Sequence, residues 1–420
     1  KSVNDSLGHA SGDEVLKDIG ARLKRLVHIA GVVARPAGDE FVVLLPDLHS
    51  PHAAQKLGQD ICHELSVTHI AHGLSIPLGA SIGIALFHRD TDSLADLMRH
   101  ADLAMYEAKR HAKGSVVVFR PELDAQAQRK ALVERELPKA IAEGELTLLY
   151  QPRVCAVSRR VESAEALIRW NHPTRGLCSP AEFIPIAEDS DLIIDIGYWV
   201  IDAACRQVAR WRAQGITDLR VAVNLSARQL ESELLETEID EALARHGLKP
   251  ADLELEITES ALVGDSPAIA KRLQRLRERG LVLALDDFGT GYSSMSYLRR
   301  LPVDILKVDR SFVIDLCTDP AAQAVATAIV AMARSLNLRT VAEGVEDEQQ
   351  LHLLCQLGVD ELQGYYFSKP VSPDTLIEQI SAEAPLGGKA ARTQVAAPAP
   401  QWPKVGSVGN TSVISAPPVT

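Results

Sequence analysis

The feature that most constrains this chain is a series of short apolar runs, each of which delivers a polar residue near its end. Between residues 144 and 384 these runs alternate with stretches whose apolar residues recur every three or four positions, the period of a helix. The runs are 147–150, 161–167, 221–223, 253–257, 281–285, 303–306, 338–342 and 359–362, and the main helical stretches are 195–213, 228–246, 266–279, 320–336 and 346–357. A strand followed by a helix, repeated about eight times over roughly 240 residues, predicts a (β/α)8 barrel of the TIM type.

The polar residues gather where the active site of such a barrel lies, at the C-terminal ends of the strands. They are Glu165, Asn224, Glu256, Asp286, Asp287, Lys307, Glu343 and Gln363. An open, doubly wound sheet also alternates strands with helices and binds ligands at strand ends. That fold usually carries a glycine-rich phosphate turn after its first strand, and none is present here. We therefore favour the barrel.

Five of these residues offer oxygen ligands from four different strand ends: Glu165, Asn224, Glu256, Asp286 and Asp287. Carboxylate and amide oxygens are what one or two hard divalent cations require, and Mg²⁺ or Mn²⁺ fits best. Four carboxylates without a cation would repel one another strongly. A metal pair polarises a phosphoryl oxygen and activates water, and a nearby lysine would then orient that water or offset charge. Any one acid could be a surface charge at a strand end, but their conjunction favours a site.

Composition excludes several classes of function. The net charge of −12 argues against nonspecific binding to nucleic acid. The six cysteines form no C-x-x-C pair, which argues against a zinc site or a disulfide framework and favours a reducing cytoplasm. No apolar run approaches the roughly 18 residues of a membrane span, and no signal peptide is visible. Because the chain opens at Lys1 rather than Met, we expect a longer protein in which an upstream sensor or inner-membrane anchor could lie.

The spacing of apolar residues and the local composition divide the chain into four parts. Residues 1–120 predict a compact α+β domain with an antiparallel sheet, built from helices near 11–27, 51–66 and 92–112 and strands near 31–35, 41–45, 78–87 and 115–119. Residues 121–143 predict a helical connector, and 144–384 form the barrel. Residues 385–420 are rich in Ala, Pro, Gly, Val and Ser, a composition typical of a disordered tail.

Ordered motifs run through the whole barrel region. They are Tyr150-Gln151-Pro152, Glu165-Ala166-Leu167 with Arg169, Phe183-Ile184-Pro185, Asn224-Leu225-Ser226, Glu256-Ile257-Thr258-Glu259, 286–294, 307–312, 342–346 and 363–367. In these motifs residues 130–382 resemble the EAL domain, a family that hydrolyses the bacterial second messenger cyclic di-GMP. The number of ordered motifs makes a chance match negligible.

The resemblance implies a role for each site residue. It implies metal binding by Glu165, Asn224, Glu256 and Asp286, a second ion at Asp286 and Asp287, and a metal environment completed by Glu343. Glu165, Lys307 and Glu343 would be the catalytic set, in which Lys307 positions the attacking water. Arg169, Asp309 and Gln363 would hold the ligand. Glu259 would support the loop from Asp287 to Ser294, which in this family shapes the second metal site and the dimer contact.

The implied reaction is metal-dependent opening of cyclic di-GMP to linear pGpG by a homodimer. None of the implied positions is substituted, which favours an active enzyme over a receptor, because receptor-type members commonly lose a metal ligand or the loop. A cyclic di-GMP receptor and a bifunctional enzyme are the alternatives. Without the resemblance, the barrel could equally house an enolising or aldol chemistry that uses Lys307 and a metal.

The first 120 residues carry a second resemblance. The segments 1–13, 35–41 and 101–109 are similar to the GGDEF domain, which makes cyclic di-GMP from two GTP molecules. The retained residues Asn4, Asp13, Asp39 and Glu40 predict GTP binding at this domain.

Three differences from the GGDEF family argue against synthesis of cyclic di-GMP by this domain. The family's first strand, with its metal-binding aspartate, would precede Lys1. Ala37 replaces the first glycine of the signature turn, where a methyl group would crowd a backbone that must approach phosphate closely. Residues 28–31 read His-Ile-Ala-Gly where the Arg-x-x-Asp motif of product inhibition should begin. We therefore expect a regulatory module, for GTP sensing or dimerisation, rather than a cyclase.

Overall fold

The structure is a computed structural model, and it describes residues 9–27, 31–46, 48, 50–66, 69–71, 74–76, 78–111, 114–262, 267–289 and 298–382. The predicted disordered tail at 385–420 lies outside the described residues, as does Asn4. The chain divides into two compact units, Lys1–Leu132 and Val133–Thr420, and each is described by itself below. Among the described residues, no helix is both long enough and apolar enough to span a membrane.

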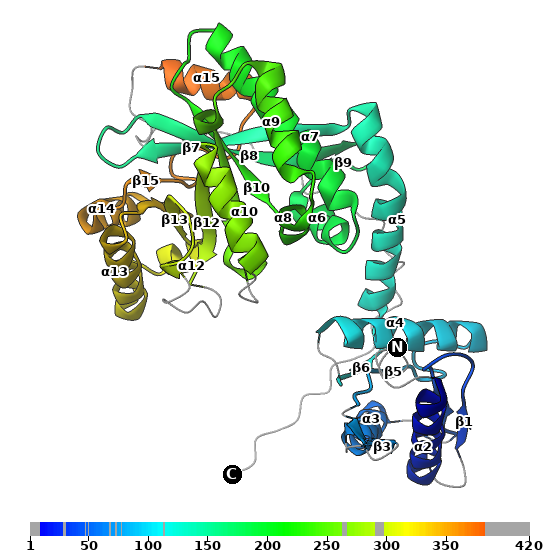
Figure 1. Cartoon of the computed structure of the whole chain (residues 1–420). Coiled ribbons are helices and arrows are strands. Elements are labelled where there is room, and N and C mark those ends of the chain that lie inside the picture. Colours follow the sequence, from blue (N-terminus) through cyan, green and yellow to red (C-terminus); the bar gives the residue numbers. More distant parts are fainter. Residues whose placement is uncertain are drawn as a thin grey trace, which may run out of the picture. The chain divides into compact units, whose positions relative to one another are not determined.

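Eight strands of the second unit close into a barrel (Figure 1). They are β7 (Leu146–Cys155), β8 (Val161–His172), β10 (Arg220–Leu225), β11 (Leu253–Thr258), β12 (Val282–Phe288), β13 (Ile305–Val308), β14 (Arg339–Ala342) and β15 (Glu361–Leu362). The strands from β10 to β15 pair in chain order, β15 pairs with β7, β7 with β8, and β8 with β10, which closes the ring. The predicted barrel is confirmed, and each apolar run of the sequence analysis supplies one of its strands.

The first strand departs from the predicted repeat of strand and helix. β7 runs antiparallel to both of its neighbours, β8 and β15, whereas the other neighbouring pairs of the ring are parallel. Only residues 156–160 join β7 to β8, and a parallel pair needs a crossover of about a dozen residues or more. The barrel therefore begins with a hairpin. This hairpin places Gln151 of β7 directly opposite Glu165 of β8.

Helices surround the strands (Figure 1). They are α6 (Pro180–Glu188), α7 (Leu192–Ala213), α8 (Ala227–Glu231), α9 (Leu235–His246), α10 (Pro267–Glu278), α12 (Arg310–Ile314), α13 (Pro320–Ser335), α14 (Glu348–Leu357) and α15 (Pro373–Ser381). The single helix predicted at 228–246 is divided into α8 and α9, because Ser232 ends α8 in an extended conformation. Ser226 begins α8 by accepting a hydrogen bond from the amide of Gln229.

The strands bury two different faces. Leu283 and Leu285 of β12 belong to the large core between strands and helices, whereas Ala284 between them packs in a separate cluster with Ile305 and Val341. Since side chains alternate across a strand, that second cluster lies inside the barrel. It fills only part of the interior. Buried charged and polar residues occupy other inward positions, among them Arg153, Glu254, Glu361 and Ser163.

The amino-terminal unit is built from smaller pieces. Its helices are α2 (His9–Val27), α3 (Pro51–Ser66) and α4 (Leu94–His111), and its strands are β1 (Val32–Ala34), β2 (Val42–Leu44), β3 (His69–Ala71), β4 (Leu74–Ile76), β5 (Ile82–Ile84) and β6 (Val116–Val118). The pair β1–β2 is antiparallel, as predicted, and β3–β4, which lies where no strand was predicted, is antiparallel as well. The predicted strands near 78–87 and 115–119 form the pair β5–β6, which is parallel rather than antiparallel, because α4 forms a crossover between them.

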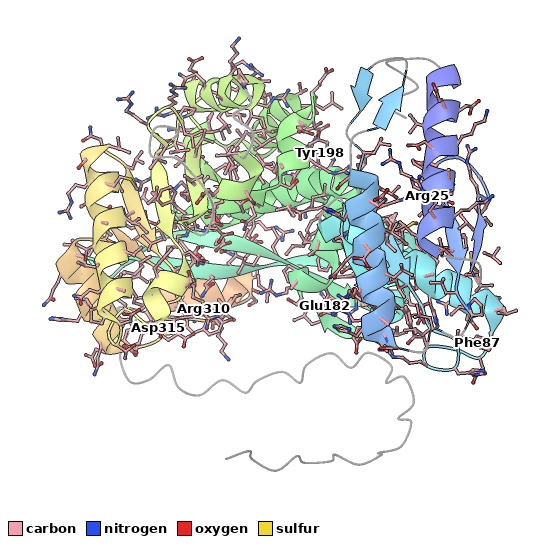
Figure 2. The ribbon with its side chains drawn as sticks, turned by 90° about the horizontal axis from the view of Figure 1, so that it is seen from below. Arg25, Phe87, Glu182, Tyr198, Arg310 and Asp315 are labelled. Atoms are coloured by element: carbon pink, nitrogen blue, oxygen red, sulfur yellow. The ribbon has the colours of Figure 1, made fainter. Side chains whose placement is uncertain are left out.

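The core of this unit is small. One cluster joins Leu23, Ile61 and Leu65, while Arg25 and Phe87, both labelled in Figure 2, are exposed. The predicted connector is a single helix, α5 (Pro121–Glu143). Its first turn contributes Leu123 to a buried cluster of the amino-terminal unit, and its later turns contribute Leu137 and Ala140 to the core of the barrel.

Candidate active site

Two adjacent aspartates at the end of β12 point into the same site. In a regular strand, successive side chains point to opposite faces. Here the pairing of β12 with β13 shifts register between Leu285 and Phe288, and Asp287 adopts a φ of 54°, in the left-handed region that aspartate tolerates better than most residues. The amide of Asp287 donates to Oδ1 of Asp286 at 2.8 Å. This bulge turns both carboxylates toward one place.

Glu343, directly after β14, joins the two aspartates. One carboxylate oxygen from each of Asp286, Asp287 and Glu343 lies within 4.8 Å of the other two. Burial, together with the charges of Asp286 and Glu165, raises the pKa of Glu343 to about 7, although Lys307 acts in the opposite direction. Burial and the neighbouring charge of Asp286 also raise the pKa of Asp287. Like charges this close favour the protonated forms of both groups, so a bound cation would favour the ionised forms of Asp287 and Glu343.

Lys307 of β13 places a positive charge among these acids. Its Nζ lies 2.7 Å from Glu256, 2.9 Å from Asp286 and 2.6 Å from Glu343, and the lysine is only 1% exposed. Burial alone would lower the pKa of Lys307, but the carboxylates of Asp286, Glu343 and Glu165 outweigh burial and raise it. The ammonium therefore stays charged and offsets the repulsion between the acids.

Glu165 of β8 is held from two sides. Asn224 of β10 donates from Nδ2 to Oε1 of Glu165 at 2.8 Å, and Gln363 donates from Nε2 to Oε2 at 2.6 Å. Burial would raise the pKa of Glu165, but Lys307, Arg153 and these two hydrogen bonds together lower it. Glu165 is therefore an ionised carboxylate whose two oxygens have fixed directions.

The remaining predicted barrel residues lie around this centre. Arg169 is half-buried, donates to the carbonyl of Ile168 at 2.8 Å, and has a pKa lowered by burial. Asp309 caps α12 by accepting from the amide of Ser311 at 3.0 Å. Glu259 is 3% exposed and accepts a 2.9 Å hydrogen bond from the amide of Gly289. That contact lies where the loop after Asp287 begins, and residues 290–297 of the loop lie outside the described residues.

Three buried polar residues beside these groups had no predicted role: Gln151, Arg153 and Glu254. Oε1 of Gln151 accepts from Nε2 of Gln363 at 3.2 Å, and Arg153 lies 2.6 Å from Glu254. A signal for Glu254 was present, since it stands two positions before Glu256 in one strand and so shares its face. Arg153 lies on β7, which runs antiparallel to its neighbours. The predicted repeat of parallel strands therefore gave no indication that its side chain would lie beneath the site.

The predicted GTP-binding residues of the amino-terminal unit have a different setting. Asp39 and Glu40 lie in the exposed turn between β1 and β2, and Asp13 is exposed on α2. The amide of Glu40 donates to the carbonyl of Ala37 at 3.0 Å, and Nε of Arg35 donates to the carbonyl of Gly38 at 2.9 Å. These bonds hold the backbone of the turn, so its acidic side chains are free to face solvent.

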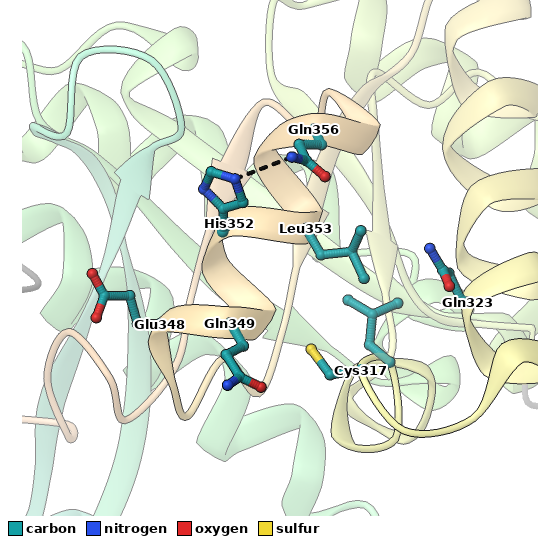
Figure 3. Close-up of a pocket in the computed structure, with 8 residues that line it drawn as sticks. Cys317, Gln323, Glu348, Gln349, His352, Leu353 and Gln356 are labelled. Carbon is teal, nitrogen blue, oxygen red and sulfur yellow. Dashed lines mark hydrogen bonds between the residues drawn. The ribbon is translucent and has the colours of Figure 1, made fainter.

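A shallow pocket of about 560 Å³ lies outside the barrel, between α14 and the segment from Leu316 to α13 (Figure 3). Nε2 of Gln356 and Nε2 of His352 lie 3.0 Å apart at its wall. The residues that line it are Leu316, Cys317, Gln323, Glu348, Gln349, His352, Leu353 and Gln356, none of which belongs to the polar group at the strand ends.

Comparison with known proteins assigns both parts of the chain to families. The EAL domain family matches residues 134–370, and the family described as diguanylate cyclase, GGDEF domain, matches residues 1–115. The chain therefore belongs to the EAL domain family and carries a GGDEF domain ahead of its barrel. Both sequence resemblances are confirmed.

Curated relatives match nearly the whole chain. A Pseudomonas aeruginosa protein named bifunctional diguanylate cyclase/cyclic di-GMP phosphodiesterase MucR is 40% identical over 91% of this chain and 56% of its own length. Cyclic di-GMP phosphodiesterase NbdA of the same species is 41% identical over 91% of this chain and 49% of its own length. The chain thus spans about half the length of the curated relatives it matches.

Solved structures match the barrel. The structure titled PaMucR phosphodiesterase, c-di-GMP complex, is 44% identical, covers 58% of this chain and 99% of its own, and has a TM-score of 0.57. The EAL domain of Xanthomonas citri FimX, titled as a complex with c-diGMP, is 25% identical, covers 59% of this chain and 96% of its own, and has a TM-score of 0.54.

Proposed function

We propose that this chain hydrolyses one of the two phosphodiester bonds of cyclic di-GMP to give linear pGpG, in a reaction that depends on Mg²⁺ or Mn²⁺. The observation that carries the proposal is the group of Asp286, Asp287 and Glu343, whose carboxylate oxygens lie within 4.8 Å of one another beside Glu165 and Lys307. The names of the relatives support the substrate, because two of them are cyclic di-GMP phosphodiesterases.

The donor set fits hard divalent cations, since it consists of carboxylate and amide oxygens. In the proposal Asp286, Asp287 and Glu343 hold one ion, and Glu165, Asn224, Glu256 and Asp286 hold the other. When bound, such ions polarise a phosphoryl oxygen and lower the pKa of water. The bulge at Asp287 is the feature that lets two neighbouring residues of one strand serve a single site.

The side chains around the acids would carry the other tasks. Lys307 keeps its proton, so it would orient the attacking water and offset charge rather than act as a base. Arg169 and Gln363 would hold the ligand, and a guanidinium suits the paired oxygens of a phosphate. Asp309 lies close enough to Asp287 to influence its pKa, and it would contact the ligand at that side. Glu259 would fix the start of the loop through Gly289.

We further propose that the GGDEF domain regulates hydrolysis, by binding GTP or by pairing two chains, rather than synthesising cyclic di-GMP. The substituted residue Ala37 lies in the exposed turn beside Asp39 and Glu40, where a nucleotide phosphate would have to approach. The alternative is a bifunctional enzyme, which the name of MucR favours.

The deciding experiment is to incubate the purified chain with cyclic di-GMP and Mn²⁺, and to separate the products by chromatography. EDTA and Glu165→Ala serve as parallel samples. We expect pGpG from the wild-type chain and none with EDTA. In Glu165→Ala the rate should fall at least about 1,000-fold, because a metal's contribution of several kcal/mol corresponds to such a factor.

Other outcomes separate the alternatives. Retained activity in a folded Glu165→Ala variant would remove Glu165 from the site. Tight binding of cyclic di-GMP without product would favour a receptor. Formation of cyclic di-GMP from GTP alone would favour the bifunctional enzyme, and a monomer by light scattering with and without ligand would contradict the proposed homodimer.

A further inference from the structure

Beneath the acids of the candidate site lies a buried arginine, Arg153 of β7, which is 0% exposed. The interior of a TIM barrel is usually filled by layers of bulky aliphatic side chains. In this barrel Ala284, Ile305 and Val341 fill one part of the interior in that manner. A charged side chain in the remaining part would be costly to bury without a full set of partners.

The guanidinium of Arg153 reaches three partners, two on β11 and one directly after β15. Nη1 lies 2.6 Å from Oε1 of Glu254, Nη2 forms an ion pair with Oε1 of Glu256, and Nε donates to Oε1 of Gln363 at 2.9 Å. Burial would lower the pKa of Arg153, but Glu254, Glu165 and Glu361 outweigh it and raise the pKa. The group is therefore a permanent cation with three fixed directions.

The first consequence concerns Glu256. Its Oε2 faces Lys307 at 2.7 Å, while its Oε1 faces Arg153. One cation thus lies against each oxygen of this carboxylate. Movement of Glu256 away from this position would break a buried ion pair and leave a charge unpaired in the interior.

The second consequence concerns the amide of Gln363. An amide side chain can be turned by half a rotation, which exchanges its donor and its acceptor. A guanidinium only donates, so the oxygen of Gln363 must face Arg153. The NH₂ group is thereby directed to Oε2 of Glu165 at 2.6 Å and to Oε1 of Gln151 at 3.2 Å. Arg153 therefore determines which atom Gln363 presents to Glu165.

We propose that Arg153 is a positioning residue for the metal site, and this inference rests on the proposed function of that site. It acts through Glu256 on one side and through Gln363 and Glu165 on the other, without touching the ligand. Residues that orient metal ligands typically change metal affinity about 10- to 100-fold when they are removed.

The simpler reading is that Arg153 only neutralises Glu254. Arg220 of β10 provides the matched control for that reading, because its Nε lies 2.8 Å from Oε2 of the same Glu254 and its Nη2 forms an ion pair with Glu361. Both arginines compensate the charge of Glu254, but the contacts to Glu256 and Gln363 are made by Arg153.

The test uses the whole chain and measures Mn²⁺ affinity by calorimetry, beside kcat and KM for cyclic di-GMP. Arg153→Met alone would leave two buried carboxylates short of a cation, and it could fail to fold. The double variant Arg153→Met/Glu254→Gln removes one positive and one negative charge together. Arg153→Lys keeps the charge but cannot reach three partners. Circular dichroism and the thermal midpoint establish folding for each variant.

We expect the double variant to bind Mn²⁺ about 10- to 100-fold more weakly, with kcat falling more than KM rises, and Arg153→Lys to show a smaller loss in the same direction. Arg220→Met should stay within about threefold of the wild type. Wild-type Mn²⁺ affinity in a folded double variant or in Arg153→Lys would overturn the inference, as would an equal loss in Arg220→Met. A wild-type chain that binds Mn²⁺ without hydrolysing cyclic di-GMP would instead refute the proposed function and leave this inference standing.

Discussion

The barrel and the amino-terminal unit both present acidic residues at a turn or strand end, but they hold them in opposite ways. In the barrel, Glu165, Glu256 and Asp286 are at most 7% exposed, and each has a hydrogen-bond or ion-pair partner at a set distance. In the amino-terminal unit, Asp39 and Glu40 are exposed in the turn between β1 and β2, where the hydrogen bonds hold backbone groups of Ala37, Gly38 and Glu40. The side chains of the barrel site are organised before any ligand arrives, whereas in the turn the backbone is held and the acidic side chains face solvent.

The largest expected difference between the two regions follows from Lys307→Met. Removing this ammonium leaves Glu256, Asp286 and Glu343 without their common cation, and breaking a buried ion pair by removing one partner costs about 3–5 kcal/mol. We expect loss of hydrolysis and a lower free energy of unfolding, measured by urea denaturation. Mn²⁺ should restore part of that stability, because it supplies the missing positive charge.

The matched change in the other region is Asp39→Asn with Glu40→Gln. Exposed substitutions usually change stability by no more than about 0.5 kcal/mol. Equal destabilisation by the two sets of substitutions would contradict the contrast between a buried, paired site and an exposed turn.

Two glycines, one in each region, allow the tolerance of the two backbones to a side chain to be compared. Gly289 (φ 97°) and Gly38 (φ 55°) both adopt left-handed conformations, but a Cβ on Gly289 would lie 2.9 Å from the ring of Phe312, while a Cβ on Gly38 would meet nothing within 4 Å. Gly38→Ala should cost about 1–2 kcal/mol from the left-handed conformation alone. Gly289→Ala should cost about 1–3 kcal/mol more from overpacking. Equal thermal midpoints for the two variants would show that Phe312 moves aside freely.

The smallest expected effect is a pH dependence that belongs to the barrel. Because the pKa of Glu343 is raised to about 7, Mn²⁺ must displace a proton at lower pH, and its affinity should fall by up to about tenfold per pH unit below that value. Calorimetry at pH 6.5 in buffers of different ionisation enthalpy should detect proton release on binding. Glu343→Gln should abolish that release, and unchanged release in the variant would assign the proton to another group.

The same shift has a consequence for the metal-free chain. The folded state keeps a proton on Glu343 that the unfolded state loses near its ordinary pKa of 4.5, so stability falls as pH rises from about 4.5 to 7. Glu343→Gln should therefore raise the thermal midpoint of the metal-free chain at pH 8. Its midpoint at pH 4, where Glu343 is protonated in both states, should match that of the wild type.

Most of the fold and of the site residues could be predicted from the sequence because their signals are local. An apolar run such as 281–285 specifies a buried strand, and the acids that follow it mark the end where ligands bind in parallel barrels. The direction of β7 was not predicted, because a repeat of one strand and one helix was assumed throughout the barrel. The short connection at 156–160 is itself a local signal, since it permits only a hairpin.

The sequence by itself determined the barrel, the order of its strands and the identity of the polar residues at their ends, since alternation and helical period are properties of neighbouring residues. Only the tertiary structure decided which side chains meet. Lys307 contacts Glu256 across 51 positions, and Arg153 contacts Gln363 across 210. Such contacts exist because closure of the sheet brings distant strands together, and the bulge that aligns Asp286 with Asp287 depends on the register of the neighbouring strand.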